Sequence, residues 1–340
     1  MTPTKTSLLA LLAALPLAAC GEPGASEEMR ESDGEANAPG TYIPEEAVTE
    51  ARTDRYDGFA DEDVAGQDGM ARSPDIIDQD TRDRMEGEAG LRRVVEDDRR
   101  AEAMARDGER RPAQTLTFFG LEPDMTVVEV WPGGGYYADI LAPYLAERGR
   151  YYAVANERPG GADRYRERFA DEGRYGRVEI ATLGAERGLD GVPDGSADMV
   201  LTFRNVHNFT MGGYGERAFQ GFYDALKPGG ILGVVEHRLP EDYDDAMMES
   251  SGYMKTSTVI ELAEAAGFEL AEESELNANP KDTADHPFGV WTLPPRSVTE
   301  DRQGNAPEGF DAARYAAIGE SDRMTLRFVK PIGADGALLE

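Results

Sequence analysis

The sequence is poor in the side chains that bind transition metals or form crosslinks. Its 340 residues contain one cysteine and three histidines. An intramolecular disulfide is therefore excluded, and we expect no metal site. Positive charge is also scarce, because 35 Lys and Arg stand against 66 Asp and Glu, a formal net charge of -31. Phosphate backbones repel such a chain, so we expect no nucleic-acid partner and interpret the acidity as a solvated surface.

Two catalytic motifs are missing as well. The sequence has no Gly-x-Ser-x-Gly, which argues against an α/β-hydrolase, and no Gly-x-x-x-x-Gly-Lys-Ser/Thr, which argues against a phosphate-binding P-loop. Apolar residues make up 40% of the chain, below the usual share for a globular protein. We therefore expect part of the chain to be unstructured.

The N-terminus has the pattern of an export signal. Lys5 precedes the apolar run Leu8–Ala19, which is too short to span a membrane as a mature helix. Small residues then lead into Cys20, an arrangement that resembles a lipobox, in which the thiol is acylated. We expect residues 1–19 to be a lipoprotein signal peptide, with a plain signal peptide as the alternative. Because Gly21 rather than Asp follows, we expect a lipid anchor through Cys20 in the outer membrane, facing the periplasm.

The chain after the signal divides by composition. Residues 20–88 are rich in Gly, Glu, Asp, Ser and Pro, and they are predicted to be an acidic disordered tether. Residues 89–120 show helical spacing of apolar side chains, ending in a short helix Ala113–Phe119 with Gly120 as its stop. The domain that remains is predicted to span residues 121–332.

The segment Thr126–Tyr137 organises this domain. A short apolar run typical of a buried strand is followed by three glycines, Gly133, Gly134 and Gly135, and then by a helical pattern over Tyr136–Leu145. Glycines let a backbone approach a ligand, and a helix start offers free N–H groups to an anion or a nucleotide. An ordinary tight turn is the alternative.

Strands and helices alternate through the rest of the domain. The predicted strands are Tyr151–Ala155, Val178–Thr182, Asp198–Phe203, Ile231–Glu236, Phe268–Glu273 and Met324–Val329, and the predicted helices are Ala162–Glu172, Gly215–Ala225 and Ser257–Ala266. This order predicts an α/β fold with a Rossmann-like, doubly wound, mostly parallel sheet. The last two strands lack a helix between them, so we expect an antiparallel last strand, preceded by a long insertion over residues 277–319.

Four motifs occur in a familiar order. Glu129 precedes the spaced glycines, Glu157 ends the second strand, Pro193–Asp198 leads into the fourth, and Leu226–Gly230 turns into the fifth. Together they resemble class I S-adenosylmethionine-dependent methyltransferases. The segments EVWPGGGYYADILAPYL, LTFRNVHNF and DRMTLRFVKP resemble, more narrowly, a group of predicted exported bacterial methyltransferases.

The resemblance implies S-adenosylmethionine as cofactor. Gly133, Gly134 and Gly135 would then form the platform for its methionine end. Glu157, with Asn156 as the fallback, would accept hydrogen bonds from the ribose hydroxyls, because an ionised carboxylate only accepts. Glu129 would bind the ammonium group or brace the glycine turn.

The sequence also departs from the family. Trp131 stands where the family has its first glycine, and it would form a wall of the pocket or fill space. No clear equivalent of the family's adenine-binding Asp or Asn follows the third strand.

The candidate catalytic residues lie in Phe203–Phe209, after the fourth strand, at the edge where doubly wound sheets bind ligands. His207 is a candidate base, and Asn205 and Asn208 are candidates for orienting the acceptor. Arg204 is a candidate anion contact, placed with Phe203 among the cofactor-binding residues. The alternative is that these polar groups satisfy the loop backbone. His237–Arg238, after the fifth strand, form a second candidate pair.

We therefore expect methyl transfer to an unidentified small molecule or envelope component in the periplasm. S-adenosylmethionine should not cross the inner membrane unaided, so an exported enzyme needs a source of it. The alternative is a non-catalytic ligand-binding module on the same fold. A third class, an NAD-dependent oxidoreductase, is disfavoured by the motifs before the fourth and fifth strands.

Overall fold

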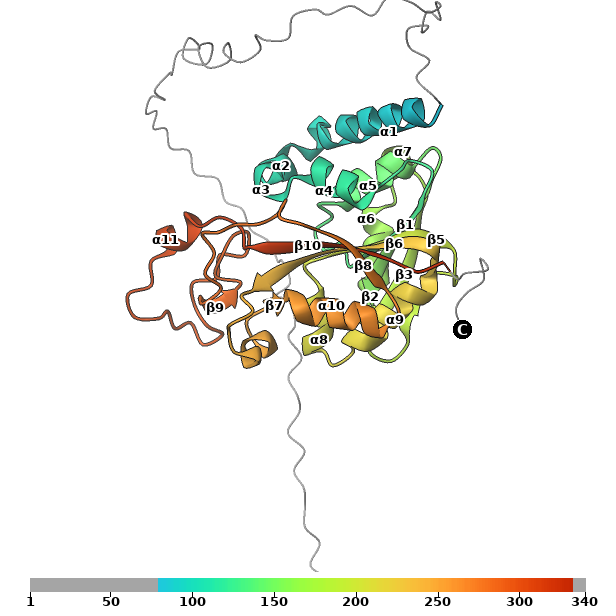
Figure 1. Ribbon diagram of the computed structural model, residues 1–340. Coiled ribbons are helices and arrows are strands. Elements are labelled where there is room, and N and C mark those ends of the chain that lie inside the picture. The colour runs from blue at the N-terminus through green and yellow to red at the C-terminus, as the bar shows by residue number, and fades with distance from the viewer. Residues whose placement is uncertain (1–78, 333–340) are drawn as a thin grey trace, which may run out of the picture. The chain divides into compact units, whose positions relative to one another are not determined.

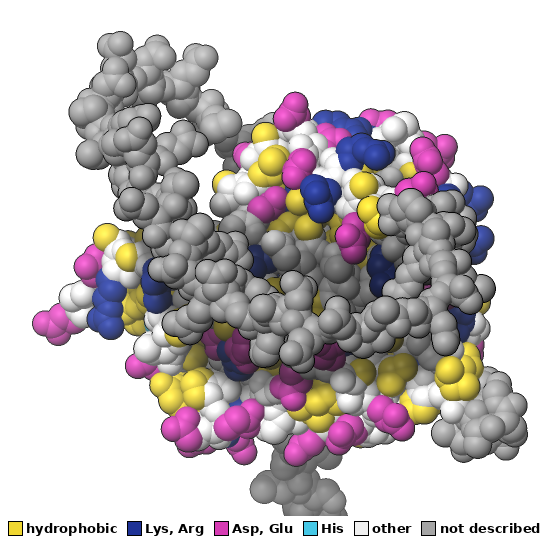
Figure 2. Space-filling view, turned by 45° about the horizontal axis from the view of Figure 1, so that its top comes forward, with side chains coloured by type: hydrophobic (Ala, Val, Ile, Leu, Met, Phe, Trp, Pro, Cys, Tyr) yellow, Lys and Arg dark blue, Asp and Glu magenta, His cyan; other side chains and the backbone are white. Residues whose placement is uncertain are grey.

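The computed structural model describes residues 79–332, with side chains from Asp83 onward. The predicted signal peptide, Cys20 and most of the predicted tether therefore lie outside the described residues. Within the described range no helix is both long and apolar enough to cross a membrane. Acidic side chains are scattered around the face in Figure 2, with Lys and Arg among them.

A single mixed sheet forms the centre of the domain, as Figure 1 shows. Its strands run in the order β4-β3-β2-β1-β5-β6-β10-β8, and β7 pairs with β6 off this path. The strands of this sheet are β1 (Thr126–Val130), β2 (Arg150–Asn156), β3 (Val178–Gly184), β4 (Gly188–Asp190), β5 (Ala197–Phe203), β6 (Leu226–Leu239), β7 (Met254–Lys255), β8 (Glu269–Ser274) and β10 (Arg323–Val329), whereas β9 (Pro287–Val290) lies outside it. The five strands from β3 to β6 are parallel, whereas β10 is antiparallel to both β6 and β8. The predicted doubly wound sheet with an antiparallel last strand is confirmed.

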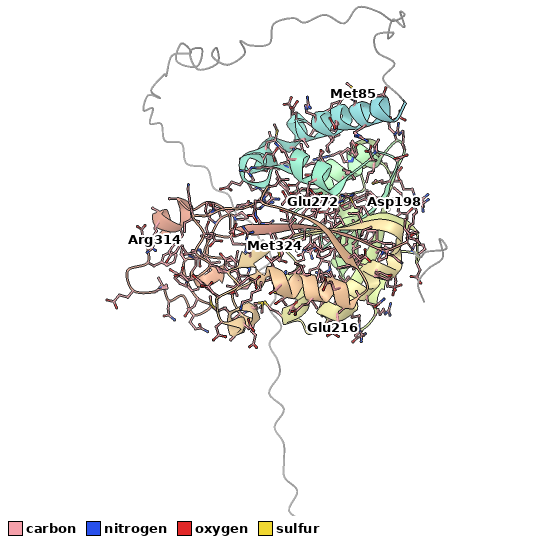
Figure 3. The ribbon with its side chains drawn as sticks, in the orientation of Figure 1. Met85, Asp198, Glu216, Glu272, Arg314 and Met324 are labelled. Atoms are coloured by element: carbon pink, nitrogen blue, oxygen red, sulfur yellow. The ribbon has the colours of Figure 1, made fainter. Side chains whose placement is uncertain are left out.

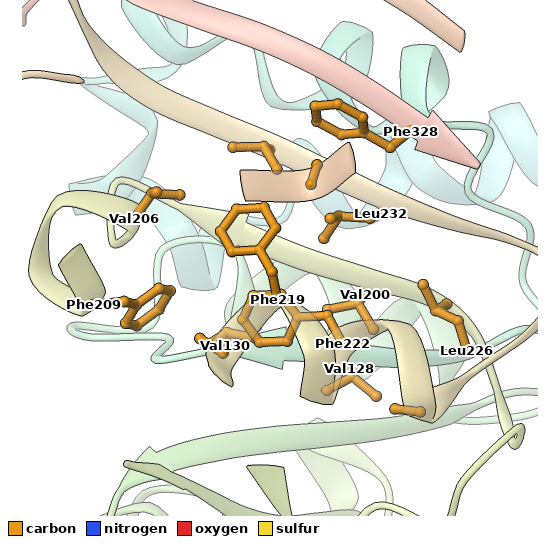
Figure 4. Close-up of a cluster of buried hydrophobic side chains, with 14 of the residues drawn as sticks. Val128, Val130, Val200, Val206, Phe209, Phe219, Phe222, Leu226, Leu232 and Phe328 are labelled. Carbon is orange, nitrogen blue, oxygen red and sulfur yellow. The ribbon is translucent and has the colours of Figure 1, made fainter. Parts of the chain in front are cut away.

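Helices cover both faces of the sheet (Figure 1). One face packs against α1 (Gln79–Val95), α4 (Pro112–Phe119), α5 (Ala138–Leu145), α6 (Gly161–Arg168) and α7 (Glu172–Tyr175). The other packs against α8 (Val206–Met211), α9 (Gly215–Ala225) and α10 (Thr256–Ala265). Figure 4 shows part of this second core, in which Phe219 and Phe222 of α9 lie against Val128 and Val200 of the sheet.

The central strand β1 shows why an unbroken apolar run forms the middle of such a sheet. Val128 and Val130 belong to the core under α9, whereas Val127 belongs to the core under α5. Both faces of the strand are buried, so neither face can be polar without a compensating partner. Glu129 is the polar side chain in this strand, and its partner is described below.

The amino-terminal edge of the strands is fixed by Asp198, at the start of β5. Its carboxylate accepts hydrogen bonds from the Thr126 N–H (2.8 Å) and the Lys227 Nζ (2.5 Å). Lys227–Gly230 forms a bulge, because Ala197 pairs with Leu226 whereas Met199 pairs with Ile231. In Figure 3 Asp198 lies at the opposite end of the molecule from Arg314 of α11 (Ala312–Ala316).

Several elements differ from the sequence prediction. The first helix begins at Gln79, inside the predicted tether, where buried Gly87 lies against Tyr144. The helix predicted over Ala162–Glu172 ends at Arg168 and resumes as α7, capped by the Asp171 side chain. Residues 188–190, which are not among the predicted strands, form the edge strand β4. The remaining short elements are η2 (Asp98–Arg100), α2 (Ala101–Met104), α3 (Asp107–Arg110) and η3 (Asp245–Glu249).

The segment between β6 and β10 adds a small core of its own. Leu239, Tyr253, Ala284 and Val290 are buried together, with Trp291 packed against them. β9 and α11 of this segment lie in the left-hand part of Figure 1. It lies next to the carboxyl end of β6, where the candidate site is found.

Candidate active site

The strand order reverses between β1 and β5, and the glycine turn follows β1 at this point. Gly133 and Gly135 have φ angles of 59° and 85°, in the left-handed region that favours glycine. The Gly133 N–H donates to the Tyr165 hydroxyl at 3.0 Å. Gly134 is exposed, and a Cβ there would meet nothing within 4 Å. The turn therefore offers an open backbone surface at the edge where such sheets bind ligands.

A guanidinium lies directly on this turn. A Cβ on Gly135 would overlap Arg168, whose Nη2 is 2.9 Å from the Asp139 carboxylate on α5. Glycine is thus favoured at position 135 for two reasons: its φ angle is positive, and the Arg168 side chain packs against its Cα. The sequence motif showed the glycine but not this partner.

Trp131 adopts the conformation that glycine favours, with a φ of 51°. This is the position where the resembled family has its first glycine, so the tryptophan accepts a strained backbone there. Its ring packs edge-on against Phe209, with centroids 5.0 Å apart. Within the described part of the chain its buried Nε1 has no hydrogen-bond partner. The indole fills space against α8 and leaves one donor unused.

Glu129 is buried and accepts a hydrogen bond from the Tyr151 hydroxyl at 2.5 Å. Burial raises the pKa of this carboxyl to about 8, and the Tyr151 hydrogen bond only partly opposes the shift. At neutral pH the group is therefore mainly uncharged. In this geometry Glu129 links β1 to β2 through Tyr151.

The two ribose-binding candidates both lie at the carboxyl end of β2. Glu157 is exposed, and its Oε1 accepts a hydrogen bond from the Glu186 N–H at 3.2 Å. Its side chain lies across Gly184, where any Cβ would overlap it. Asn156 is half-buried, and its Oδ1 has no hydrogen-bond partner among the described residues. The end of β2 therefore offers acceptor atoms beside the open glycine turn.

The segment after β5 is tied closely to its neighbours. Phe203 stacks on Tyr137, with centroids 3.6 Å apart. The Asn205 Nδ2 donates to the Val130 carbonyl (3.1 Å) and the Phe203 carbonyl (3.2 Å). The amide of Asn205 thus links the ends of β1 and β5, the backbone role given above as the alternative. Asn208 lies in the first turn of α8 and is half-buried.

His207 is buried and is held by Glu236, a residue the sequence reasoning placed in a strand and did not single out. The His207 Nδ1 lies 3.0 Å from Glu236 Oε1. The same carboxylate accepts the Val206 N–H (2.5 Å) and the His237 N–H (2.8 Å). Because these contacts make Glu236 an acceptor, the proton of His207 is on Nδ1, and Nε2 is left as a proton acceptor. The sequence signal that could have identified Glu236 as a site residue is its position near the carboxyl end of a predicted strand, directly before His237.

His237, the second candidate, shares this site. Its ring lies 5.4 Å from that of His207, and its Nδ1 is 2.5 Å from the Ser321 hydroxyl. Burial, followed by the proximity of His207, lowers the pKa of His237 well below its usual value, so the ring is neutral at pH 7. Arg238, in contrast, pairs with Glu275 and Asp322.

The two histidines and Glu236 bring potential metal ligands within 4.8 Å of one another. Both carboxylate oxygens already accept hydrogen bonds, so the cluster is satisfied as a hydrogen-bond network without an ion. The Trp291 ring covers it, 6.2 Å from His207.

Two cavities lie elsewhere: one of about 400 Å³ between α1 and α5, and one of about 350 Å³ between α1 and the end of α4. Gly87 and Tyr144 line both of them, and none of the candidate site residues does. We therefore place the candidate active site at the carboxyl ends of the strands and not at these cavities.

No family model and no curated protein matches the sequence. Among solved structures, an S-adenosylmethionine-dependent methyltransferase from Aquifex aeolicus is 20% identical, with a TM-score of 0.42, over 55% of this chain and 92% of its own. An arsenic(III) S-adenosylmethionine methyltransferase from Chlamydomonas reinhardtii is 15% identical, with a TM-score of 0.38, over 61% of this chain and 64% of its own. The cyclase SpnF is 17% identical, with a TM-score of 0.43, over 66% of this chain and 81% of its own. Likenesses at this level leave the function to be inferred from the site itself.

Proposed function

We propose that the protein binds S-adenosylmethionine at the carboxyl ends of β1 and β2 and transfers its methyl group to a small molecule or envelope component. The observation that carries the proposal is the open glycine turn beside Glu157 at the reversal of strand order. Ligands of doubly wound sheets bind at this reversal.

The residues present fit a polar nucleoside ligand. Asn156 Oδ1 and Trp131 Nε1 are an acceptor and a donor that are buried without partners among the described residues. Glu157, directly after Asn156, and Gly134, three residues after Trp131, are both exposed. A ligand with hydroxyl and amine groups would satisfy the unused atoms, whose isolation otherwise costs about 1–3 kcal/mol each. Glu129 would support this site by linking β1 to β2 through its hydrogen bond with Tyr151.

The bound cofactor would supply an electrophilic methyl group. The protein then has to position the acceptor and, where the acceptor must lose a proton, remove it. His207 would take this role, because its Nδ1 faces Glu236 and its Nε2 would then be left to accept the proton. Glu236 acts through His207 and is a positioning residue.

Calorimetric titration with S-adenosylmethionine, S-adenosylhomocysteine and NAD tests the cofactor. We expect heat with the first two and none with NAD, and weaker binding of both by a Glu157→Ala variant. Wild-type affinity in that variant would remove the ribose assignment to Glu157. The absence of heat with both sulfur nucleosides would reject methyl transfer, and binding without label transfer would favour the ligand-binding module.

Label transfer from methyl-labelled S-adenosylmethionine to an envelope extract tests the base. For an acceptor that ionises, His207→Gln should lower the rate by about 10²–10⁴-fold and leave affinity for S-adenosylhomocysteine unchanged. Glu236→Gln should alter the pH profile of the rate, because the tautomer of His207 is no longer fixed. Equal rates in wild type and His207→Gln would show that His207 is not the base.

We also propose that the protein is an outer-membrane lipoprotein facing the periplasm, acylated at Cys20. The support is the sequence pattern before Cys20. A Cys20→Ser variant should be recovered in the soluble fraction, and continued membrane retention would contradict the anchor.

A further inference from the structure

Three arginines gather beside the candidate base around one carboxylate. Arg110 and Arg323 are 2% and 3% exposed, and Glu320 between them is 3% exposed. Arg204, at the end of β5, completes the group. This local excess of positive charge stands out in a chain with a net charge of -31. Buried charges are ordinarily paired, so an unmatched cation calls for a partner.

Glu320 is fully used by two of the three arginines. Its Oε1 and Oε2 accept from Arg110 Nε at 2.8 and 2.9 Å, and Arg323 Nη1 lies 2.9 Å from Oε2. These contacts, from Arg110 first, hold the pKa of Glu320 below its usual value against the effect of burial. The carboxylate therefore stays ionised, but its lone pairs are already occupied.

Arg204 is left without a carboxylate of its own. Its Nη1 approaches Glu320 only to 3.8 Å, beyond hydrogen-bond distance, and its side chain is 27% exposed. Burial, followed by repulsion from Arg110, lowers the pKa of its guanidinium to about 10, so it remains charged at neutral pH. Its backbone has a φ of 62°, an uncommon angle for a residue with a side chain. Strain of this kind persists where surrounding structure enforces it, often at functional sites.

A second observation points to a missing acceptor. Arg323 Nε is buried, and no residue of the described range accepts a hydrogen bond from it. His237 adds no negative charge, because it is neutral and itself lies in the field of these arginines. The site thus holds one unused buried donor, and Arg204 has only a long ion pair with a carboxylate that the other two arginines already engage.

We propose that Arg204 binds an anionic group, a carboxylate or a phosphate, on the methyl acceptor. The assignment to the acceptor rests on the proposed function. It is favoured because Arg204 belongs to the ends of β5 and β6, where its backbone N–H pairs with the Val235 carbonyl, whereas the glycine turn follows β1. The charge of Arg204 also acts on His237, whose ring lies 5.4 Å from that of His207, so an acceptor held by Arg204 would lie close to the candidate base.

Anion binding can be measured without knowing the acceptor. Thermal unfolding of the full-length protein is measured in phosphate and in acetate. The reference is the same protein in chloride at equal ionic strength. Arg204→Gln is the test variant and Arg204→Lys the charge-retaining variant. Arg174→Gln is the matched control, because Arg174 is 30% exposed with a similarly long ion pair of 3.6 Å.

We expect phosphate and acetate to raise the Tm of wild type and Arg174→Gln beyond the effect of chloride. Arg204→Gln should bind both anions at least about tenfold more weakly, and Arg204→Lys should retain part of the response. An equal response in wild type and Arg204→Gln, or no response of wild type beyond that to chloride, would overturn the proposal.

Adding S-adenosylhomocysteine separates the two sources of a carboxylate. An anion response that persists with this nucleoside bound supports an acceptor site. A response that it abolishes would assign Arg204 to the cofactor's own carboxylate and overturn the acceptor assignment. If the nucleoside does not bind but the Arg204-dependent response remains, the anion site stands and the proposed methyl transfer fails.

Discussion

The two halves of the sheet end in opposite ways. At the ends of β1 and β2 the chain is open, with exposed Gly134 and Glu157 and unused polar atoms nearby. At the ends of β5 and β6 it is closed, with Glu236 fully buried and hydrogen-bonded to His207. The first region is suited to receiving a ligand, and the second to holding catalytic groups in fixed positions. The difference predicts that removing the buried carboxylates of the second region mainly costs stability, whereas removing the exposed Glu157 side chain of the first mainly costs binding.

The largest effect is expected on the closed side. Glu320→Ala removes the shared carboxylate and leaves Arg110 and Arg323 buried without it. Breaking a buried pair in this way should lower the free energy of unfolding by about 3–5 kcal/mol. Urea denaturation measures this change. Asp163→Ala, which removes the exposed ion pair with Arg166, is the control. If Glu320→Ala lowers the free energy of unfolding no more than this control does, the cluster is solvated.

The pH dependence of stability should report on Glu129. Its folded pKa of about 8 lies above the ordinary value of 4.5, so the folded state favours the protonated form. Its contribution to the free energy of unfolding is complete below pH 4.5 and is lost as the pH rises through about 8. The free energy of unfolding should fall by at most about 1.4 kcal/mol per pH unit over this range. Glu129→Gln should remove this part of the slope in urea denaturation across that range. An unchanged slope would mean that Glu129 is already ionised in the folded protein.

The sequence predicts the sheet well because its strands are short apolar runs separated by glycine and proline turns. Glu157, the glycine turn and His207 could be singled out as candidates because they lie after strands, and a sequence pattern locates strand ends. The partners were not found: Arg110, Glu236 and Glu320 come from distant segments, and only the folded chain brings them together. The start of α1 was missed because its first turns are polar, and the first core position on that helix is Leu91.

The glycine turn should tolerate substitution very unevenly. Gly135→Ala places a Cβ in the Arg168 guanidinium at a φ of 85°, and should cost about 1–3 kcal/mol. Gly134→Ala is the matched control, because a Cβ there meets nothing within 4 Å, and should be nearly neutral. Chemical denaturation of both variants measures the difference. Equal losses would show that the turn does not have the backbone described.

A smaller effect is expected from the unused donor of Trp131. Trp131→Phe keeps a ring against Phe209 and removes Nε1. If Nε1 serves the ligand, affinity for S-adenosylhomocysteine should fall by about 0.5–1.5 kcal/mol in calorimetry, the value of one hydrogen bond. Affinity that does not change would leave the indole a space-filling role only.

The division between the two halves can be tested directly by hydrogen exchange with and without S-adenosylhomocysteine. Our account predicts new protection in peptides covering Gly133–Gly135 and Glu157, and little change around Glu236, whose surroundings are already buried and hydrogen-bonded. Protection confined to the Glu236 region, or no protection anywhere, would contradict it.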